Sequence, residues 1–175
     1  MTVDLSWLAR YRSSEPHFGL ERMEALLALR GNPHLACPVI HLAGTNGKGS
    51  TLAHLRSLLE AKELRVGVFT SPYLVSFNEQ ISIDGIPISD LDVETYLSLY
   101  QELLAKNSSD QTLRGLTEFE LLTVLAFDYF AAEKPDVVIL EVGIGGRLDS
   151  TNVCQPILTA ITTIGLDHVA LLGPD

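Results

Sequence analysis

The stretch Val39–Ser50 constrains the fold of this chain more than any other part of the sequence. A short apolar run, Val39–Leu42, leads into three glycines, a lysine and a hydroxyl residue. Leucines at helical spacing follow, so Ser50–Leu64 is predicted to be a helix. A buried strand that enters a glycine-rich loop and then a helix gathers backbone N–H groups at a helix N-terminus, where an anion can bind. We therefore expect an α/β fold in which this loop binds phosphate.

Strand and helix patterns alternate along the rest of the chain. Short runs rich in β-branched residues are typical of the central strands of parallel sheets. Their alternation with helices predicts a doubly wound α/β fold, a mostly parallel sheet with helices on both faces, and ligands beyond the carboxyl ends of the strands. The predicted strands are Val39–Leu42, Val66–Thr70, Asp136–Val142 and Leu158–Ile164, with a hairpin in Gln80–Ile88. The predicted helices are Leu20–Arg30, Ser50–Leu64, Ser89–Lys106 and Thr117–Ala132, and Ser71–Glu79 and Asn107–Gly115 are expected to be loops.

The composition excludes several classes of protein. The 175 residues suit one domain, and 46% apolar with 19% charged residues excludes a disordered chain. The net charge of −10 argues against nonspecific binding to nucleic acid or to an anionic membrane. No apolar run approaches the roughly 18 residues of a membrane-spanning helix. Two cysteines make no disulfide framework, although one bridge is conceivable, so a cytoplasmic protein is expected.

The glycine-rich loop has the residue types that bind the phosphates of a nucleotide. Glycines let successive N–H groups turn inward, Lys48 supplies a positive charge for the β- and γ-phosphates, and Ser50 offers a hydroxyl to phosphate or metal. The spacing departs from G-x-x-x-x-G-K-[ST], because Gly49 separates Lys48 from Ser50. The alternative is a glycine-rich turn with an exposed lysine. The predicted nucleotide-binding residues are Gly44, Thr45, Asn46, Gly47, Lys48, Gly49 and Ser50.

Two further strands end in polar residues. Glu141 ends the run Val137–Glu141 ahead of a glycine-rich turn, and a carboxylate there can ligate the Mg²⁺ that accompanies ATP. The alternatives are a salt bridge to Arg147 or a solvated carboxylate. His168 follows the next predicted strand, and a lone histidine is more often structural than a ligand. Mg²⁺ prefers oxygen, whereas Mn²⁺ accepts imidazole more readily.

Four motifs in this order resemble the folylpolyglutamate synthase/dihydrofolate synthase family of the Mur-ligase superfamily. They are Gly44–Ser50, Thr70–Leu74, Glu141–Asn152 and Asp167–His168, and the entry segment Phe18–Arg22 followed by Gly31-Asn32-Pro33 also fits. The resemblance extends over essentially the whole chain. It implies a P-loop-type ATPase domain of the Mur-ligase kind and an ATP-dependent enzyme that adds L-glutamate to a folate or to dihydropteroate through an acyl phosphate.

The resemblance also implies roles for individual residues. Lys48, Glu141 and His168 would be catalytic, and Ser71, Glu141 and His168 would hold Mg²⁺ or Mn²⁺. Ser71 could otherwise form only a Ser-Pro turn. The segment Thr117–Glu120 has a second interpretation, because Thr-x-x-Glu before an apolar helix is a capping box. The implied substrate-binding residues are Phe18, Arg22, Thr117, Glu118, Phe119, Glu120, Leu148, Asp149 and Ser150.

Some features depart from the family pattern. Ser76 and Gln80 stand where family members often carry arginines, which places loop contacts to an anionic folate in question. A chain that ends at Asp175 would be an incomplete N-terminal ATP-binding domain, without the C-terminal Rossmann-like domain, and is expected to be inactive by itself and monomeric. The alternatives are another Mur-type amino-acid ligase and a truncated nucleotide-binding fragment without catalysis.

Overall fold

The computed structural model describes residues 3–12 and 19–173. These residues include one six-stranded sheet with the strand order β4-β3-β2-β5-β1-β6. Strands β2, β5, β1 and β6 are parallel, whereas β3 and β4 form an antiparallel hairpin at one edge. The predicted doubly wound, mostly parallel sheet is confirmed. The strands are β1 Val39–Ala43, β2 Val66–Phe69, β3 Ile81–Ile83, β4 Ile86–Pro87, β5 Val137–Glu141 and β6 Leu158–Ile161.

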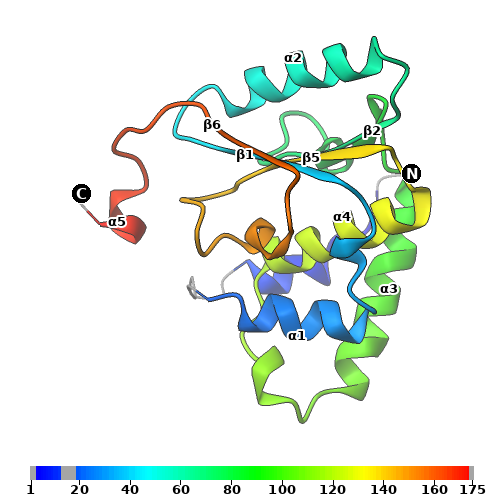
Figure 1. The fold of residues 1–175 in the computed structure, drawn as a ribbon. Helices are drawn as coiled ribbons and strands as arrows, with labels where there is room; N and C mark the ends of the chain where they lie inside the picture. Colours follow the sequence, from blue (N-terminus) through cyan, green and yellow to red (C-terminus); the bar gives the residue numbers. More distant parts are fainter. Residues whose placement is uncertain (1–2, 13–18, 174–175) are drawn as a thin grey trace.

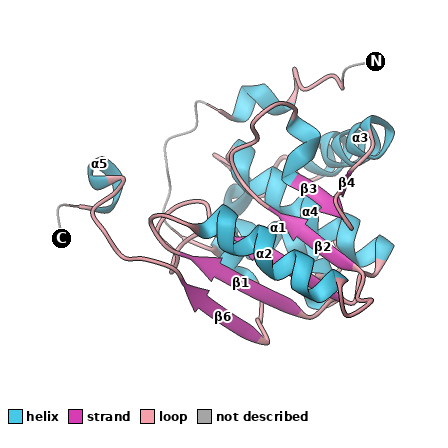
Figure 2. Ribbon diagram, turned by 90° about the horizontal axis from the view of Figure 1, so that it is seen from above, coloured by secondary structure: helices cyan, strands magenta, loops and turns pink. Residues whose placement is uncertain are grey.

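Helices cover both faces of the sheet. Helix α2 lies alone on one face, and α1, α3 and α4 lie on the other, while α5 projects away from the sheet near the C-terminal end (Figures 1 and 2). Helix α4 is buried on most of its sides, as its almost continuously apolar sequence predicts. The helices are α1 Glu21–Leu29, α2 Lys48–Glu60, α3 Asp90–Lys106, α4 Glu118–Glu133 and α5 Val169–Leu172, and the 3₁₀ turns are η1 Leu8–Tyr11, η2 Pro33–Leu35, η3 Phe77–Gln80, η4 Gln111–Leu113 and η5 Ser150–Val153.

The sheet divides the hydrophobic core into two layers. The larger cluster joins the sheet to α1, α3 and α4, and the smaller one packs α2 through Leu52 onto Ile40 and Leu42 of β1. Because alternate residues of a strand point to opposite faces, β1 contributes to both layers. The larger layer also buries charged side chains, and Asp128 there accepts hydrogen bonds from Arg30 and Tyr100.

The predicted elements are found, but several ends differ. Helix α2 begins at Lys48 and ends at Glu60. Three residues later, Glu63 takes a left-handed conformation (φ 62°), which prevents the helix from continuing. Strand β6 ends at Ile161 rather than Ile164, because residues 162–165 bond to the glycine-rich loop instead of extending the sheet. The expected loop Asn107–Gly115 contains a 3₁₀ turn that buries Leu113. Each difference arises from a contact remote in sequence or from one turn residue.

Cys37 and Cys154 are free thiols rather than a bridge. Burial raises the pKa of the Cys154 thiol to about 11, so this thiol carries little nucleophilic thiolate at neutral pH. Within residues 3–12 and 19–173, no helix is both long enough and apolar enough to cross a membrane.

Candidate functional site

The glycine-rich loop joins β1 to α2 at the carboxyl end of the strand. Gly44 (φ 137°) and Gly47 (φ 84°) both take backbone conformations that side chains disfavour. A Cβ on Gly44 would also overlap the Thr162 hydroxyl, so this position requires glycine for space as well as for conformation. The predicted strand–loop–helix geometry is therefore present.

The loop presents an uncapped helix N-terminus with a lysine beside it. Gly47 is the N-cap of α2, no side chain caps it, and no acidic residue lies in the first turn. Its N–H groups and the helix dipole favour an anion there. The Lys48 Nζ donates to the Gly44 carbonyl oxygen over 2.8 Å and is partly buried. Lys48 is thus held against the loop rather than extended into solvent.

A second segment, residues 162–165, holds the loop in place through hydrogen bonds. The Thr45 N–H donates to the Thr163 carbonyl over 2.8 Å, and the Asn46 N–H donates to the Thr163 hydroxyl over 3.0 Å. In return, the Thr162 hydroxyl donates to the Asn46 carbonyl over 2.7 Å. Sequence reasoning missed these threonines, because the loop that they contact is more than 100 residues away in sequence.

Glu141 lies at the end of β5, next to the end of β2. Its side chain is buried, and one of its oxygens accepts a hydrogen bond from the Thr70 hydroxyl. Among the described residues no ion pair joins Glu141 to Arg147, so that alternative is wrong, and burial also excludes a solvated carboxylate. Ser71 directly follows Thr70 in the chain, which places its hydroxyl at the same end of the sheet.

His168 reaches this end of the sheet from the segment that precedes α5. It takes a left-handed conformation (φ 49°), its side chain is about half exposed, and its Nε2 lies 3.8 Å from Asp167 Oδ2. His168 and Ser71 line the same cavity. The structure thus brings two of the predicted metal-binding residues to one cavity, and the third, Glu141, ends the strand beside it.

The side chains of Glu141, Ser71 and His168 are of the chemical types that bind a divalent cation. A buried carboxylate oxygen and a serine hydroxyl are ligands that suit Mg²⁺, and the imidazole of His168 suits Mn²⁺ better. Within the part of the chain that the structure describes, no three His, Cys, Asp or Glu side chains gather closely enough to hold a metal by themselves. Such a cation would therefore need oxygens from elsewhere, for which the phosphates of a nucleotide are suited.

A cavity of about 840 Å³ lies at this end of the molecule. Its volume is in the range of pockets that hold small organic ligands. The segments that line it come from η1, the loop after β2, the start of α4 and the turn before η5. Of the predicted substrate-binding residues, the cavity is lined by Arg22, Thr117, Glu118, Phe119, Glu120, Leu148, Asp149 and Ser150, and Phe18 lies outside the described residues.

The segment Thr117–Glu120 forms the predicted capping box, and its residues also line the cavity. Thr117 is the N-cap of α4 and forms a capping box with Glu120, so the helix start is stabilised as predicted. The same Glu120 accepts a hydrogen bond from Arg22 Nε over 2.9 Å, in a buried ion pair that joins α1 to α4. Arg22 Nη2 is also buried and has no hydrogen-bond partner among the described residues.

Phe119 is held against the cavity by close packing. Its ring stacks on Phe69 with centroids 5.9 Å apart, and a Cβ on Gly143 would come within 2.7 Å of Phe119 Cζ. Gly143 therefore lets the glycine-rich turn after β5 approach the ring. An aromatic ring fixed in this way offers a flat apolar surface at the cavity.

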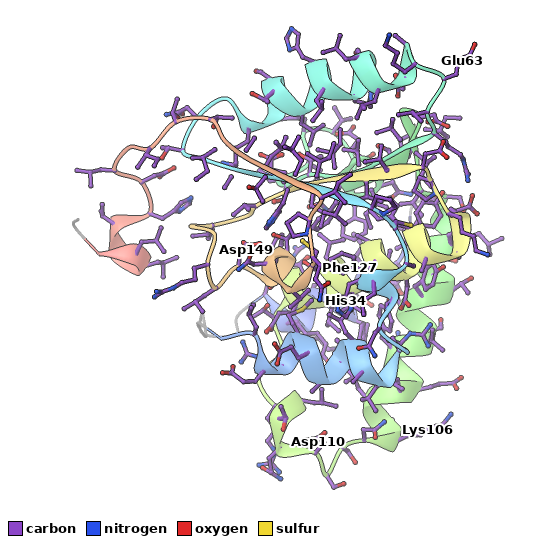
Figure 3. The ribbon with its side chains drawn as sticks, viewed as in Figure 1. His34, Glu63, Lys106, Asp110, Phe127 and Asp149 are labelled. Atoms are coloured by element: carbon purple, nitrogen blue, oxygen red, sulfur yellow. The ribbon has the colours of Figure 1, made fainter. Side chains whose placement is uncertain are left out.

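Asp149 forms part of the cavity wall and is buried on the face of the sheet opposite α2 (Figure 3). Its Oδ2 accepts from the Ile144 N–H over 2.9 Å, and its Oδ1 accepts from the Thr151 N–H over 2.9 Å. Asp149 therefore fixes the turn after β5 as well as the start of η5. Its side chain has a structural role that the sequence prediction did not include.

Sequence reasoning also missed residues at the rim of the cavity. Arg12 donates to Glu118 over 2.7 Å, which joins η1 to the first turn of α4. Hydrogen bonding to Glu118 and the charge of that carboxylate raise the pKa of Arg12. Tyr73, in the loop after β2, lines the same rim. Of the two departures from the family pattern, Gln80 lines the cavity and Ser76 does not. The new contacts join distant segments, and no local spacing indicated them.

The comparisons with known proteins agree with this geometry. No family model matches the chain. The chain is 51% identical over 158 residues to a dihydrofolate synthase/folylpolyglutamate synthase of Bacillus subtilis, covering 89% of this chain and 36% of that protein. Its fold matches an FPGS–AMPPCP complex with a TM-score of 0.90 at 38% identity, over 98% of this chain and 41% of that one. An FPGS–AMPPCP–folate complex matches with a TM-score of 0.87 at 38% identity, over 99% and 43%.

Over most of its length this chain is similar to proteins of the folylpolyglutamate/dihydrofolate synthase family. It spans about a third of the length of the curated relatives, 36% in the Bacillus subtilis and Lacticaseibacillus casei proteins. The fold, a mostly parallel sheet with helices on both faces, is the fold of the matching part of the solved FPGS structures.

Proposed function

We propose that residues 1–175 form the N-terminal ATP-binding part of an ATP-dependent ligase that joins L-glutamate to a folate or to dihydropteroate. One observation carries this proposal. The braced phosphate loop and the 840 Å³ cavity lie at the same end of the sheet, with Ser71 and His168 at the cavity. The solved relatives include complexes with AMPPCP, an ATP analogue, and with AMPPCP and folate together.

The chemistry requires both sites to be adjacent. A carboxylate is a poor electrophile, so one of its oxygens first attacks the γ-phosphorus of ATP, and ADP leaves. The amine nitrogen of glutamate then attacks the carbonyl carbon of the acyl phosphate, and phosphate leaves. Lys48 and the N–H groups of the loop Gly44–Ser50 would offset the negative charge on the transferred phosphoryl group.

Glu141, Ser71 and His168 would together hold Mg²⁺ or Mn²⁺ against the phosphates of ATP. The cation would supply positive charge at the phosphoryl oxygens. The support from this structure is the donor chemistry, the place of Glu141 and Ser71 at the ends of the adjacent strands β5 and β2, and the place of His168 at the same cavity as Ser71. Glu141 is the strongest member of the set, because a buried carboxylate needs a counter-charge or several donors and Thr70 supplies one donor.

The cavity would bind the folate or dihydropteroate. Phe119 would stack on the pterin ring, since its own ring is already fixed by Phe69 and presents a flat surface. The other residues proposed to form this site are Phe18, Arg22, Thr117, Glu118, Glu120, Leu148, Asp149 and Ser150. We also propose that the protein is a cytoplasmic monomer, and the two free thiols support the cytoplasmic location.

Ligation by the full-length protein tests the proposal directly. We expect ATP-dependent amide formation between glutamate and dihydropteroate or a folate, followed by release of ADP. The Lys48→Ala variant should lose nearly all of this activity. A full-length protein that is folded and turns over neither substrate would contradict the proposal, as would a Lys48→Ala variant with full activity. The isolated 175-residue chain should bind Mg-ATP weakly in calorimetry and should catalyse little ligation.

A further inference from the structure

The buried residue His41 lies between the phosphate loop and the cavity wall. It is on β1, three residues before Gly44, and its side chain is buried. Its neighbours Ile40 and Leu42 pack in the layer under α2, whereas Val39 packs in the layer of α1 and α4. Because side chains alternate along a strand, His41 points with Val39 into the layer that contains the cavity wall.

A chain of three side chains leads from His41 to Asp149. His41 Nε2 lies 2.7 Å from Thr151 Oγ1, and Thr151 Oγ1 lies 2.5 Å from Asp149 Oδ1. A hydroxyl has one hydrogen to donate. The Asp149 carboxylate can only accept, so the Thr151 hydroxyl donates to it and must accept its other bond from His41. The neutral His41 ring therefore carries its proton on Nε2.

The last member of the chain, Asp149, is fixed on both oxygens. Besides Thr151, its Oδ2 accepts from the Ile144 N–H, in the turn that follows β5. Asp149 and Ile144 both line the cavity. The orientation of this carboxylate thus depends on Thr151, and the orientation of the Thr151 hydroxyl depends on His41. The three residues are all buried, where each hydrogen bond is strong and a missing partner is costly.

We propose that His41 is a positioning residue for the substrate cavity: through Thr151 it fixes the Asp149 carboxylate and the turn that carries Ile144. This inference rests on the proposed function, because it takes the cavity as the folate-binding site. His41 contacts no ligand in this role. It acts from the strand that ends in the phosphate loop, yet its hydrogen bond is directed at the cavity wall, so its loss affects folate binding rather than nucleotide binding.

The test uses matched variants of Thr151 and His41. Thr151→Val removes the hydroxyl at nearly constant shape, and Thr151→Ser retains it. His41→Leu removes the donor, and His41→Gln retains an N–H near the Nε2 position. Calorimetry would give the dissociation constants for folate and for Mg-ATP, and thermal melting would show that each variant is folded. The same variants in the full-length protein would give KM for the folate substrate and kcat separately.

We expect Thr151→Val and His41→Leu to weaken folate binding about tenfold, with Mg-ATP binding within about twofold of the parent, which corresponds to the loss of one buried hydrogen bond. Thr151→Ser and His41→Gln should restore most of the affinity. Equal losses for folate and Mg-ATP, or no rescue by the conservative variants, would overturn the inference.

A ligand-free readout separates this inference from the proposed function. The ¹⁵N shifts of the His41 ring should show a proton on Nε2, and amide exchange at Ile144 should quicken in Thr151→Val but not in Thr151→Ser. If the parent protein binds no folate, the proposed function fails while this readout still tests the hydrogen-bond chain. A proton on Nδ1 only, or unchanged exchange at Ile144, would contradict the chain itself.

Discussion

The glycine-rich loop Gly44–Ser50 and the cavity wall are built in different ways. The loop Gly44–Ser50 is held mainly by backbone carbonyls, backbone N–H groups and hydroxyls, many at exposed positions. The wall is held by buried side-chain pairs between distant segments: Arg22 and Glu120 are 98 residues apart, and His41 and Thr151 are 110 apart. A substitution in the loop should therefore mainly change ligand binding, whereas a substitution in the wall should also change the stability of the fold.

The largest expected effect is in the wall. Arg22→Met removes the cation from a buried pair and leaves Glu120 buried with only the hydrogen bonds of its capping box. We expect the free energy of unfolding to fall by about 3–5 kcal/mol, the usual cost of leaving one buried charge unpaired. Urea denaturation followed by circular dichroism measures this change.

Arg12→Met is the matched control for that variant. The Arg12–Glu118 pair has the same chemistry and a shorter distance, 2.7 Å, but the Arg12 side chain is 52% exposed. Exposed ion pairs contribute at most about 1 kcal/mol, so this variant should be nearly neutral for stability. Similar losses from both variants would mean that burial does not distinguish the two pairs, and the contrast between wall and rim would fail.

In the loop, Gly47 and Gly49 are expected to give smaller changes in stability that differ in sign. Gly47 has φ 84° and Gly49 lies within α2, and a Cβ on either would meet open space. Gly47→Ala should therefore lower stability by about 1–2 kcal/mol through backbone strain alone. Gly49→Ala should raise stability by about 0.5–1 kcal/mol, because alanine favours the helix. Thermal melts of both variants check the opposite signs, and equal signs would show that Gly47 is not held in the left-handed conformation.

The smallest effect concerns pH. Burial lowers the pKa of His41 and His34 below the ordinary value of 6.5, against the weaker opposite effect of the charges of Asp149 and Glu24. Below about pH 6.5 these two histidines therefore bind protons more readily in the unfolded chain than in the folded protein. The free energy of unfolding is thus highest above about pH 6.5 and falls as the pH drops below this value. Urea midpoints between pH 7 and pH 5 measure this loss, and a His34→Gln/His41→Gln double variant should flatten it. A midpoint that rises on acidification would contradict the assignment.

The sequence predicted the strand–loop–helix geometry around Gly44–Ser50 well, because this geometry depends on local chemistry. Gly44 and Gly47 are needed for their own backbone conformations, and the strand and helix around them follow from periodicity. The start of α4 at Thr117 was predicted for the same reason, since a capping box is a contact between near neighbours.

The cavity wall could be predicted only in part. The family resemblance indicated Arg22, Glu120 and Asp149, but the ion pair between the first two and the link from Asp149 to His41 depend on how distant segments pack. The same reason explains why β6 is shorter than predicted. Thr162 and Thr163 bond to the loop after β1, and nothing in their local sequence shows that partner.

One crossed binding measurement tests the central claim, that the loop and the cavity are two separate sites at one end of the sheet. Mg-ATP and folate would each be titrated by calorimetry into the parent chain, Lys48→Ala and Phe119→Ala. Lys48→Ala should weaken Mg-ATP binding about tenfold to a hundredfold, the value of a charged hydrogen bond, and leave folate binding unchanged. Phe119→Ala should do the reverse. Variants that weaken both ligands equally, or neither, would contradict the account.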